Sequence, residues 1–337
     1  MKATLVVSAV LGLASSASAH YTFDKLFLNG VKQGGDNTYI RKHQNGYMPT
    51  KFKNTPSGSI TPNDADFACN KGATPAPKVL TVKAGDKISM QEAFGATGIQ
   101  HPGPSQFYMA PVKNAATDSP AGADWFKVHQ SLLCKSGTPE DLRHGLWCSW
   151  NEDNVNMIIP DSIPDGQYLL RGEHIGLHGA HAGEAEFYYA CAQVEVTGNS
   201  ATAMPGTAVK IPGVYKSTDA AVNFSIWGRS TSYPQAPGPD VIPGGTIRGT
   251  ADGASGDKSV RVAGGSTASS DAPASSASPS APAASSPAPS KAAAAATPAA
   301  SAPAASAPAA SAPAPSKPAP TKPASKPACS RRRRRRV

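Results

Sequence analysis

The chain has 337 residues, of which 39% are hydrophobic, and a formal net charge of +9. That positive charge lies almost entirely in residues 265–337, so the preceding part is close to neutral and offers no basic surface for a nucleic acid. The same segment consists mainly of Ala, Pro and Ser, and it has too few large apolar residues to form a packed core. We therefore predict one folded domain over residues 20–245 and a disordered tail over residues 246–337.

The first nineteen residues have the pattern of a secretory signal peptide. Lys2 precedes an apolar run from Leu5 to Ala14, and Ala17, Ser18 and Ala19 supply small residues for cleavage. The run is about 10 residues long, against about 20 needed to cross a bilayer, and no later segment is long or apolar enough. We predict a secreted, extracellular protein whose mature chain begins at His20.

A histidine at the mature amino terminus is a candidate metal chelator. His20 would offer an α-amine, whose pKa is ordinarily about 7.7 to 8.0, and an imidazole. One further imidazole would complete a nitrogen set suited to Cu(II). Of the seven other histidines, His101 is the preferred partner, because the Pro-Gly-Pro loop that contains it leads into a strand and would hold the ring in a rigid, exposed position. The alternative is that His20 is merely the residue that follows the cleavage site.

Short strands bounded by Pro, Gly and Asp recur between the signal peptide and the tail. "VLTVKAGDKISM" (residues 79–90) alternates in polarity around a central turn and predicts a β-hairpin or a pair of sandwich strands. "SQFYMAPV", "GQYLLRG" and "EFYYACAQVEVTG" are further strand candidates, and no segment has a sustained helical period. The pattern favours an all-β fold, an antiparallel β-sandwich with long loops.

Five cysteines are present, and four of them lie before the tail. In a secreted chain these four should form two disulfides, with three possible pairings. The short loop between Cys134 and Cys148 favours that pair and leaves Cys69 with Cys191 by exclusion. Cys329, alone in the tail, is either a free thiol or an intermolecular bridge. Asn223 begins the only N-glycosylation sequon that we find.

The segment "EHIGLHGAHAGEAEFYYACAQVEV" concentrates residues that could act at a metal. If a strand begins at Glu186, alternation places Glu186 and Tyr188 on one face and Cys191 on the other. His178 would lie at the end of the preceding strand. The alternative is that Tyr188 is an ordinary core aromatic.

The chain resembles the fungal lytic polysaccharide monooxygenases of auxiliary activity family nine. The resemblance rests on His20 together with "FLNGVKQG", "DFACN", "HPGPSQFYMA", "LLRGEHIGLH", "EFYYACAQVEV" and "YPQAPGP", which follow the family's order over about residues 20 to 240. It implies an immunoglobulin-like β-sandwich with one copper on a flat face, held by His20 and His101 with the Tyr188 oxygen in an axial position.

Further roles are implied by the same resemblance. His178 matches a histidine that hydrogen-bonds to oxygen bound at the copper, and the family's disulfide supports Cys69 with Cys191. Tyr233 matches a tyrosine that lies against the polysaccharide. Glu186 stands where the family has Gln, and a carboxylate there would favour Cu(II), or, if protonated, could donate a proton to bound oxygen.

The resemblance implies a monomeric copper enzyme that uses an external electron donor with O₂ or H₂O₂ to cleave a β-1,4-linked polysaccharide, most commonly cellulose, at C1, C4 or both. Two alternatives stay open: a copper-binding protein of the same fold without cleavage activity, and a carbohydrate-binding wall protein. An anionic surface could be held by the arginines that end the tail: Arg331, Arg332, Arg333, Arg334, Arg335 and Arg336.

Five other residues have alternative assignments. His181 could take the place of His178 if the loop register differs. His129 and His144, in a long insertion, could belong to the substrate face with Trp147 and Trp150, although large aromatics beside a disulfide are more often packing residues.

Overall fold

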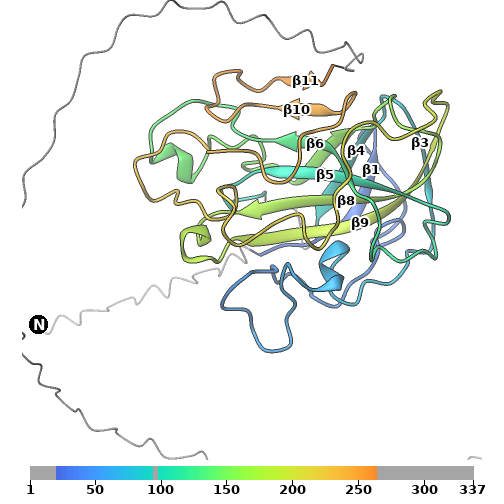
Figure 1. The fold of residues 1–337 in the computed structure, drawn as a ribbon, viewed down its shortest axis with the longest axis horizontal. Helices are drawn as coiled ribbons and strands as arrows, with labels where there is room; N and C mark the ends of the chain where they lie inside the picture. The colour runs from blue at the N-terminus through green and yellow to red at the C-terminus, as the bar shows by residue number, and fades with distance from the viewer. Residues whose placement is uncertain (1–19, 94–97, 264–337) are drawn as a thin grey trace, which may run out of the picture. The chain divides into compact units, whose positions relative to one another are not determined.

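The computed structural model describes residues 20–93 and 98–263, and these residues form two packed β-sheets (Figure 1). The four-stranded sheet has the order β2 (Val31–Lys32), β1 (Phe23–Leu28), β4 (Lys87–Glu92), β7 (Asn154–Ile158). The seven-stranded sheet has the order β11 (Ser259–Arg261), β10 (Thr246–Arg248), β6 (Phe126–Ser131), β5 (Ser105–Val112), β8 (Gly166–Gly176), β9 (Glu186–Thr197), β3 (Leu80–Lys83). The helical elements of the described ranges are the 3₁₀ turns η1 (Ala65–Ala68), η2 (Asp141–Arg143) and η3 (Ala180–Ala182).

The predicted β-sandwich is confirmed, and the structure adds the order and direction of its strands. Neighbouring strands are antiparallel except for β3 with β9 and β10 with β6, which are parallel. β3 and β4 lie in different sheets, so residues 79–90 form a pair of sandwich strands and not a hairpin. A turn that crosses between the sheets explains this: β3 pairs with β9, and β4 pairs with β1 and β7.

Both faces of the central strands of the seven-stranded sheet, β6, β5, β8 and β9, are buried over most of their length. On β9, Tyr188 and Ala190 pack into the cluster between the two sheets, where Phe107 and Leu170 also lie. The intervening Tyr189 belongs to a second cluster on the opposite face, which the long loops cover. This period of two is the one that the sequence predicted for residues 186–196. It places the side chains of Glu186 and Tyr188 on the sandwich face, at the end of the sheet where β9 begins.

Two disulfides fasten the loops to the sheet, and both predicted pairings are confirmed. Cys69 is bonded to Cys191 and ties the segment after η1 to β9. Cys134 is bonded to Cys148 and closes a loop with a sequence separation of 14. A closed loop of that length stabilises a folded chain by about 3 kcal/mol in the chain-entropy model.

The folded domain extends beyond the predicted boundary at residue 245. β10 pairs with β6, and β11 pairs with β10, so residues 246–261 complete the seven-stranded sheet. The prediction failed because these strands have only three residues each and lie in a Gly-rich segment. Residues 264–337, which include Cys329 and the arginine run, lie outside the described residues, as does the predicted signal peptide. Within the described ranges, no helix is long and apolar enough to cross a membrane.

Candidate metal centre

Four segments that are distant in sequence meet where β8 ends and β9 begins, at the left of the view in Figure 1. The ring of His101 lies 6.0 Å from that of His20, 5.3 Å from that of Tyr188 and 4.8 Å from that of His178, measured between centroids. In the β8–β9 ladder, Gly176 is opposite Glu186 and His174 is opposite Tyr188. The structure therefore brings together the residues that the sequence singled out from separate motifs.

The Pro102-Gly103-Pro104 loop holds His101 against the end of β8. The Ile175 amide donates to the Pro104 carbonyl at 3.0 Å, and the Leu177 amide donates to the Pro102 carbonyl at 2.8 Å. A Cβ atom on Gly103 would lie 1.8 Å from the Ile175 carbonyl oxygen, so only glycine allows this approach. The sequence predicted an exposed ring on this loop. His101 is buried, however, and not exposed, because the loop turns the ring inward over Tyr188.

A second glycine makes room for the two imidazoles beside β8. A Cβ on Gly176 would lie 3.2 Å from two carbon atoms of His101 and 3.5 Å from Nδ1 of His178. Contacts near 3.2 Å are closer than side chains normally tolerate, so a larger residue would push the His101 ring away. Gly176 thus permits the close packing of His101 and His178.

Glu186 is the point on which the surrounding side chains converge. Tyr188 Oη donates to Glu186 Oε2 at 2.5 Å. His101 Nε2 lies 3.4 Å from the same oxygen, and His178 Nε2 lies 3.5 Å from Oε1. Burial acts to raise the pKa of Glu186, but the contacts from His101, His178 and Tyr188 outweigh it and hold that pKa below its ordinary value. Burial, followed by the charge of Glu186, raises the pKa of Tyr188 well above its ordinary value, so its hydroxyl keeps its proton.

A tyrosine–histidine pair beneath the centre escaped the sequence analysis. The Tyr21 ring stacks on Tyr188 at 4.1 Å between centroids, and its hydroxyl lies 2.5 Å from His174 Nδ1. His174 Nε2 donates to the Gly103 carbonyl at 3.2 Å, which leaves Nδ1 to accept from Tyr21. Burial lowers the pKa of His174 to about 3, which keeps the ring neutral in this tautomer. The pair therefore connects Tyr188 to the loop that carries His101.

His20 lies at the edge of this cluster. Its ring is 6.2 Å from that of Tyr188 and 6.3 Å from that of Tyr47. Burial lowers the pKa of the His20 imidazole, and the opposing effect of Glu186 is smaller. The ring is accordingly neutral at pH 7, which is the form that binds metals.

The aromatic residues on the surface beside the centre are Tyr47 and Trp227, which are 46% and 51% exposed. Trp227 Nε1 donates to the His178 carbonyl at 2.7 Å, which fixes the indole next to the centre. The prediction that Tyr233 lies on the surface is wrong. Tyr233 is 1% exposed, and its hydroxyl donates to the Ala221 carbonyl at 2.6 Å. Its ring packs against Trp147 at 5.2 Å. The Gly-Arg-Ser segment that follows Trp227 was the available signal that this aromatic residue lies in an exposed loop.

The alternative histidine assignments receive little support from the structure. His178 lies against Glu186, whereas His181 is exposed on η3. His129 and Trp147 are buried and therefore do not belong to an outer face. His144 is exposed, with its ring 5.6 Å from that of Trp150.

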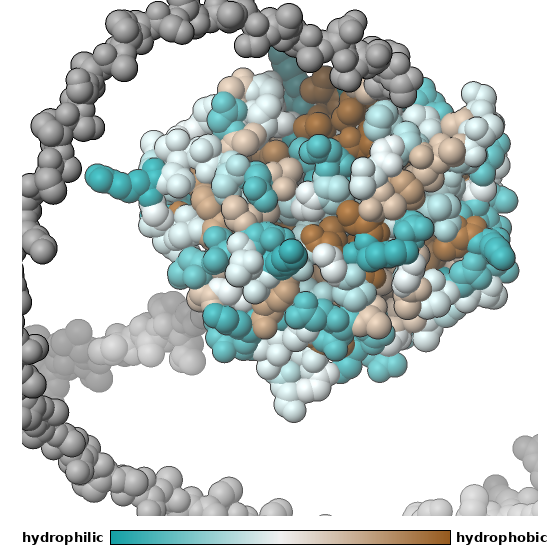
Figure 2. All heavy atoms as spheres, in the orientation of Figure 1, coloured by the Kyte–Doolittle hydropathy of each residue, from teal (hydrophilic) through white to brown (hydrophobic). Residues whose placement is uncertain are grey.

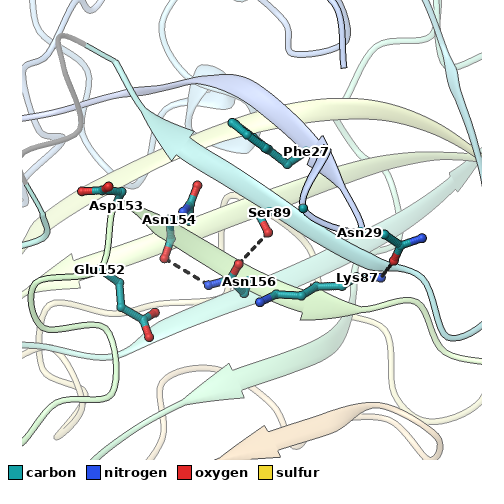
Figure 3. Close-up of a pocket in the computed structure, with 9 residues that line it drawn as sticks. Phe27, Asn29, Lys87, Ser89, Glu152, Asp153, Asn154 and Asn156 are labelled. Carbon is teal, nitrogen blue, oxygen red and sulfur yellow. Dashed lines mark hydrogen bonds between the residues drawn. The ribbon is translucent and has the colours of Figure 1, made fainter. Parts of the chain in front are cut away.

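A separate hollow of about 570 Å³ lies beside β4 and β7. Figure 3 shows that the carboxyl groups of Glu152 and Asp153 in its wall point in different directions. Glu152 Oε1 is 2.8 Å from Arg248 Nη1, and Ser89 Oγ donates to Asn156 Oδ1 at 2.6 Å. None of the residues that line this hollow is a histidine or a member of the cluster around Glu186. In Figure 2, hydrophobic residues on the face shown occur in separate areas with hydrophilic ones between them.

Comparison with known proteins gives concordant results. The family model of Auxiliary Activity family 9 (formerly GH61) matches residues 20–233. AA9 family lytic polysaccharide monooxygenase D of Aspergillus tamarii is 45% identical over 249 residues, which cover 72% of this chain and 87% of that protein. AA9 family lytic polysaccharide monooxygenase A of Aspergillus fumigatus is 45% identical over 255 residues, which cover 74% and 85%.

Solved structures agree with these relatives in fold. The extended catalytic domain of LPMO9A from Hypocrea jecorina is 27% identical with a TM-score of 0.54, and the match covers 72% of this chain and all of that domain. HiLPMO9B is 27% identical with a TM-score of 0.55, and the match covers 66% of this chain and 99% of that one.

Proposed function

Because the chain belongs to Auxiliary Activity family 9, whose members are copper-dependent monooxygenases that cleave polysaccharides oxidatively, we propose that it acts on cellulose or a related β-1,4-glucan at C1, C4 or both. The observation that carries this proposal is the convergence of His20, His101 and Tyr188 in one cluster. Imidazole nitrogens with a phenol oxygen are a donor set that suits copper.

In the proposed centre, His20 would hold copper through its α-amine and ring, His101 would add another nitrogen, and the Tyr188 oxygen would complete the donor set. Copper would supply the one-electron chemistry with O₂ or H₂O₂ that removes a hydrogen atom from a sugar carbon. The hydrogen bond from Tyr188 to Glu186 fixes the phenol, and His178, whose side chain is 38% exposed, connects Glu186 to solvent. We infer that His178 Nε2 and the Glu186 carboxylate hold and move the protons that this chemistry consumes.

The polysaccharide is proposed to lie across the exposed rings of Tyr47 and Trp227. Sugar rings stack on aromatic faces, and a crystalline fibre can lie on a flat surface although it cannot enter a groove. Both rings are close to the proposed copper ligands, since Tyr47 neighbours His20 and Trp227 is bonded to the His178 carbonyl. The surface would therefore hold the chain of sugars over the metal.

Secretion is part of the same proposal, because the α-amine of His20 becomes available only after cleavage behind Ala19. The exposed position of Asn223 is compatible with a glycan at this site. The six arginines at the end of the chain are proposed to hold anionic polymers or membranes at low salt. The enzyme would draw electrons from an external donor.

One observation favours a second candidate, a copper-binding protein of this fold that does not cleave. Glu186 stands where the resemblance leads us to expect Gln, and an anionic carboxylate near copper would stabilise Cu(II) over the reduced ion. This candidate would keep tight copper binding and lose turnover.

The experiment that separates the candidates is a product assay on the mature protein, with the His20 terminus verified by mass spectrometry. Copper-loaded protein is incubated with cellulose, ascorbate and air, and the soluble products are analysed by mass spectrometry. We expect oxidised oligosaccharides that disappear in His101→Ala. Stoichiometric copper without products would establish the second candidate, and absence of both would leave a carbohydrate-binding protein.

A further inference from the structure

We propose that His101, His178 and Glu186 form a second divalent-cation site that shares His101 with the copper centre and binds Zn²⁺ without any contribution from His20. Two imidazoles and one carboxylate are a common donor set for Zn²⁺ and other borderline divalent ions. This inference goes beyond the proposed function, because it concerns a different ligand set and a metal that carries out no redox chemistry.

The geometry of the three donors is already close to that of a bound ion. One nitrogen or oxygen from each side chain lies within 4.8 Å of the other two. Glu186 Oε2 lies 3.4 Å from His101 Nε2, and the other carboxylate oxygen, Oε1, lies 3.5 Å from His178 Nε2. Ligands placed at about 2.1 Å from a tetrahedral Zn²⁺ are about 3.4 Å apart. The carboxylate–imidazole separations therefore fit the ion, and a small rotation of the half-buried His178 would bring the imidazoles into place.

The surrounding residues hold the donors in position. Tyr188 donates to Glu186 Oε2, an interaction of the kind that orients carboxylate ligands in metal sites. The absence of a side chain at Gly176 allows the rings of His101 and His178 to meet at 4.8 Å. Trp227 fixes the backbone of His178 through its carbonyl. The site would thus need little rearrangement to bind a cation.

The charge around Glu186 also favours a cation. Its side chain is 8% exposed, and the titratable groups that face it include His101, His178 and His20. The nearby Lys51 is engaged with Glu184 at 3.2 Å. A buried carboxylate is costly unless a positive charge or a metal compensates it. A dication held by all three groups would provide that compensation.

Two consequences distinguish this site from the copper centre. It does not use the α-amine of His20, so it would bind Zn²⁺ even when a residue precedes His20. Because both sites need His101, occupation of one excludes the other.

The test is a Zn²⁺ titration by isothermal calorimetry of the full mature chain with one glycine placed before His20, which removes the amine chelate. We expect one equivalent of Zn²⁺ with micromolar or tighter affinity. Glu186→Gln and His178→Asn should each weaken binding at least tenfold. The matched control Glu184→Gln, and His20→Ala in the same background, should change it less than twofold.

Thermal melting of each variant verifies that it folds. His178→Asn changes a partly exposed side chain and should not disturb the interior. The proposal is overturned if the glycine-extended chain does not bind Zn²⁺, if Glu186→Gln binds it as tightly as the parent, or if His20→Ala abolishes binding. None of these results would bear on the proposed copper activity, which requires the native terminus and is measured by its oxidised products.

Discussion

Tyr188 has two roles at the scale of single residues, as a core aromatic and as a member of the candidate centre. Its ring stacks on Tyr21 inside the sandwich, while its hydroxyl donates to Glu186. The sequence posed these roles as alternatives, but the structure combines them. A residue at the end of a strand can pack its ring in the core and present its polar atom at the edge.

Tyr188→Phe tests the polar role. The change removes the hydroxyl that donates to the buried Glu186 carboxylate. We expect the free energy of unfolding to fall by about 1–3 kcal/mol and the copper spectrum to change. Tyr189→Phe is the matched control, since its hydroxyl bonds to Thr50 at 3.0 Å on the opposite face. Tyr189→Phe should lower stability in urea melts and leave the copper spectrum unchanged. An equal spectral change in both variants would contradict the assignment of Tyr188 to the metal centre.

The partly buried His43 predicts a pH dependence of stability. Burial lowers its pKa to about 4, below the ordinary value of 6.5, so the unfolded chain binds more protons between those two values. The stability that depends on neutral His43 is therefore complete above pH 6.5 and is lost as the pH falls towards 4, by up to about 3 kcal/mol. Urea melts at pH 7 and pH 4.5 should show a smaller difference for His43→Gln than for the parent chain.

At the scale of elements, the Pro-Gly-Pro loop is the part whose geometry the centre depends on most. Gly103→Ala would place a Cβ 1.8 Å from a backbone oxygen of β8 and must displace the loop. We expect a lower melting temperature and at least a tenfold weaker copper affinity. Gly85→Ala is the control, because that position has an unfavourable φ of +84° for alanine but no atoms nearby. The copper affinity of Gly85→Ala should be unaffected. An unchanged copper affinity in Gly103→Ala would refute the proposal that the loop positions the centre.

The elements that the sequence could predict are those with a strong local pattern. Strand alternation placed Glu186 and Tyr188 on one face, and the short spacing of Cys134 and Cys148 indicated their pairing. Pairing between distant segments has no local signal in the sequence. For this reason the sequence did not decide whether β3 and β4 form a hairpin or lie in different sheets. Tyr233 was misplaced because its surface position was inferred from the resemblance alone. Here the Tyr233 amide donates to the Ala251 carbonyl, and the ring is buried.

At the scale of the whole molecule, the last two strands decide where the folded unit ends. The Leu132 amide donates to the Arg248 carbonyl and the Leu133 amide to the Thr250 carbonyl, both at 3.0 Å. A chain truncated after Ala263 should melt within about 2 °C of the full chain, whereas truncation after Gly245 removes these bonds and should lower the melting temperature by several times that amount. Equal melting of the two truncated chains would show that β10 and β11 contribute nothing.

The assembly of the copper centre from His20 and His101 is the central claim, and copper electron paramagnetic resonance on the mature protein tests it most directly. With a verified His20 terminus and one copper per chain, we predict an axial type 2 spectrum with coupling to three nitrogens, and its loss in His101→Ala. A protein that begins at His20 and binds no copper, or whose spectrum is the same without the His101 imidazole, would contradict the account.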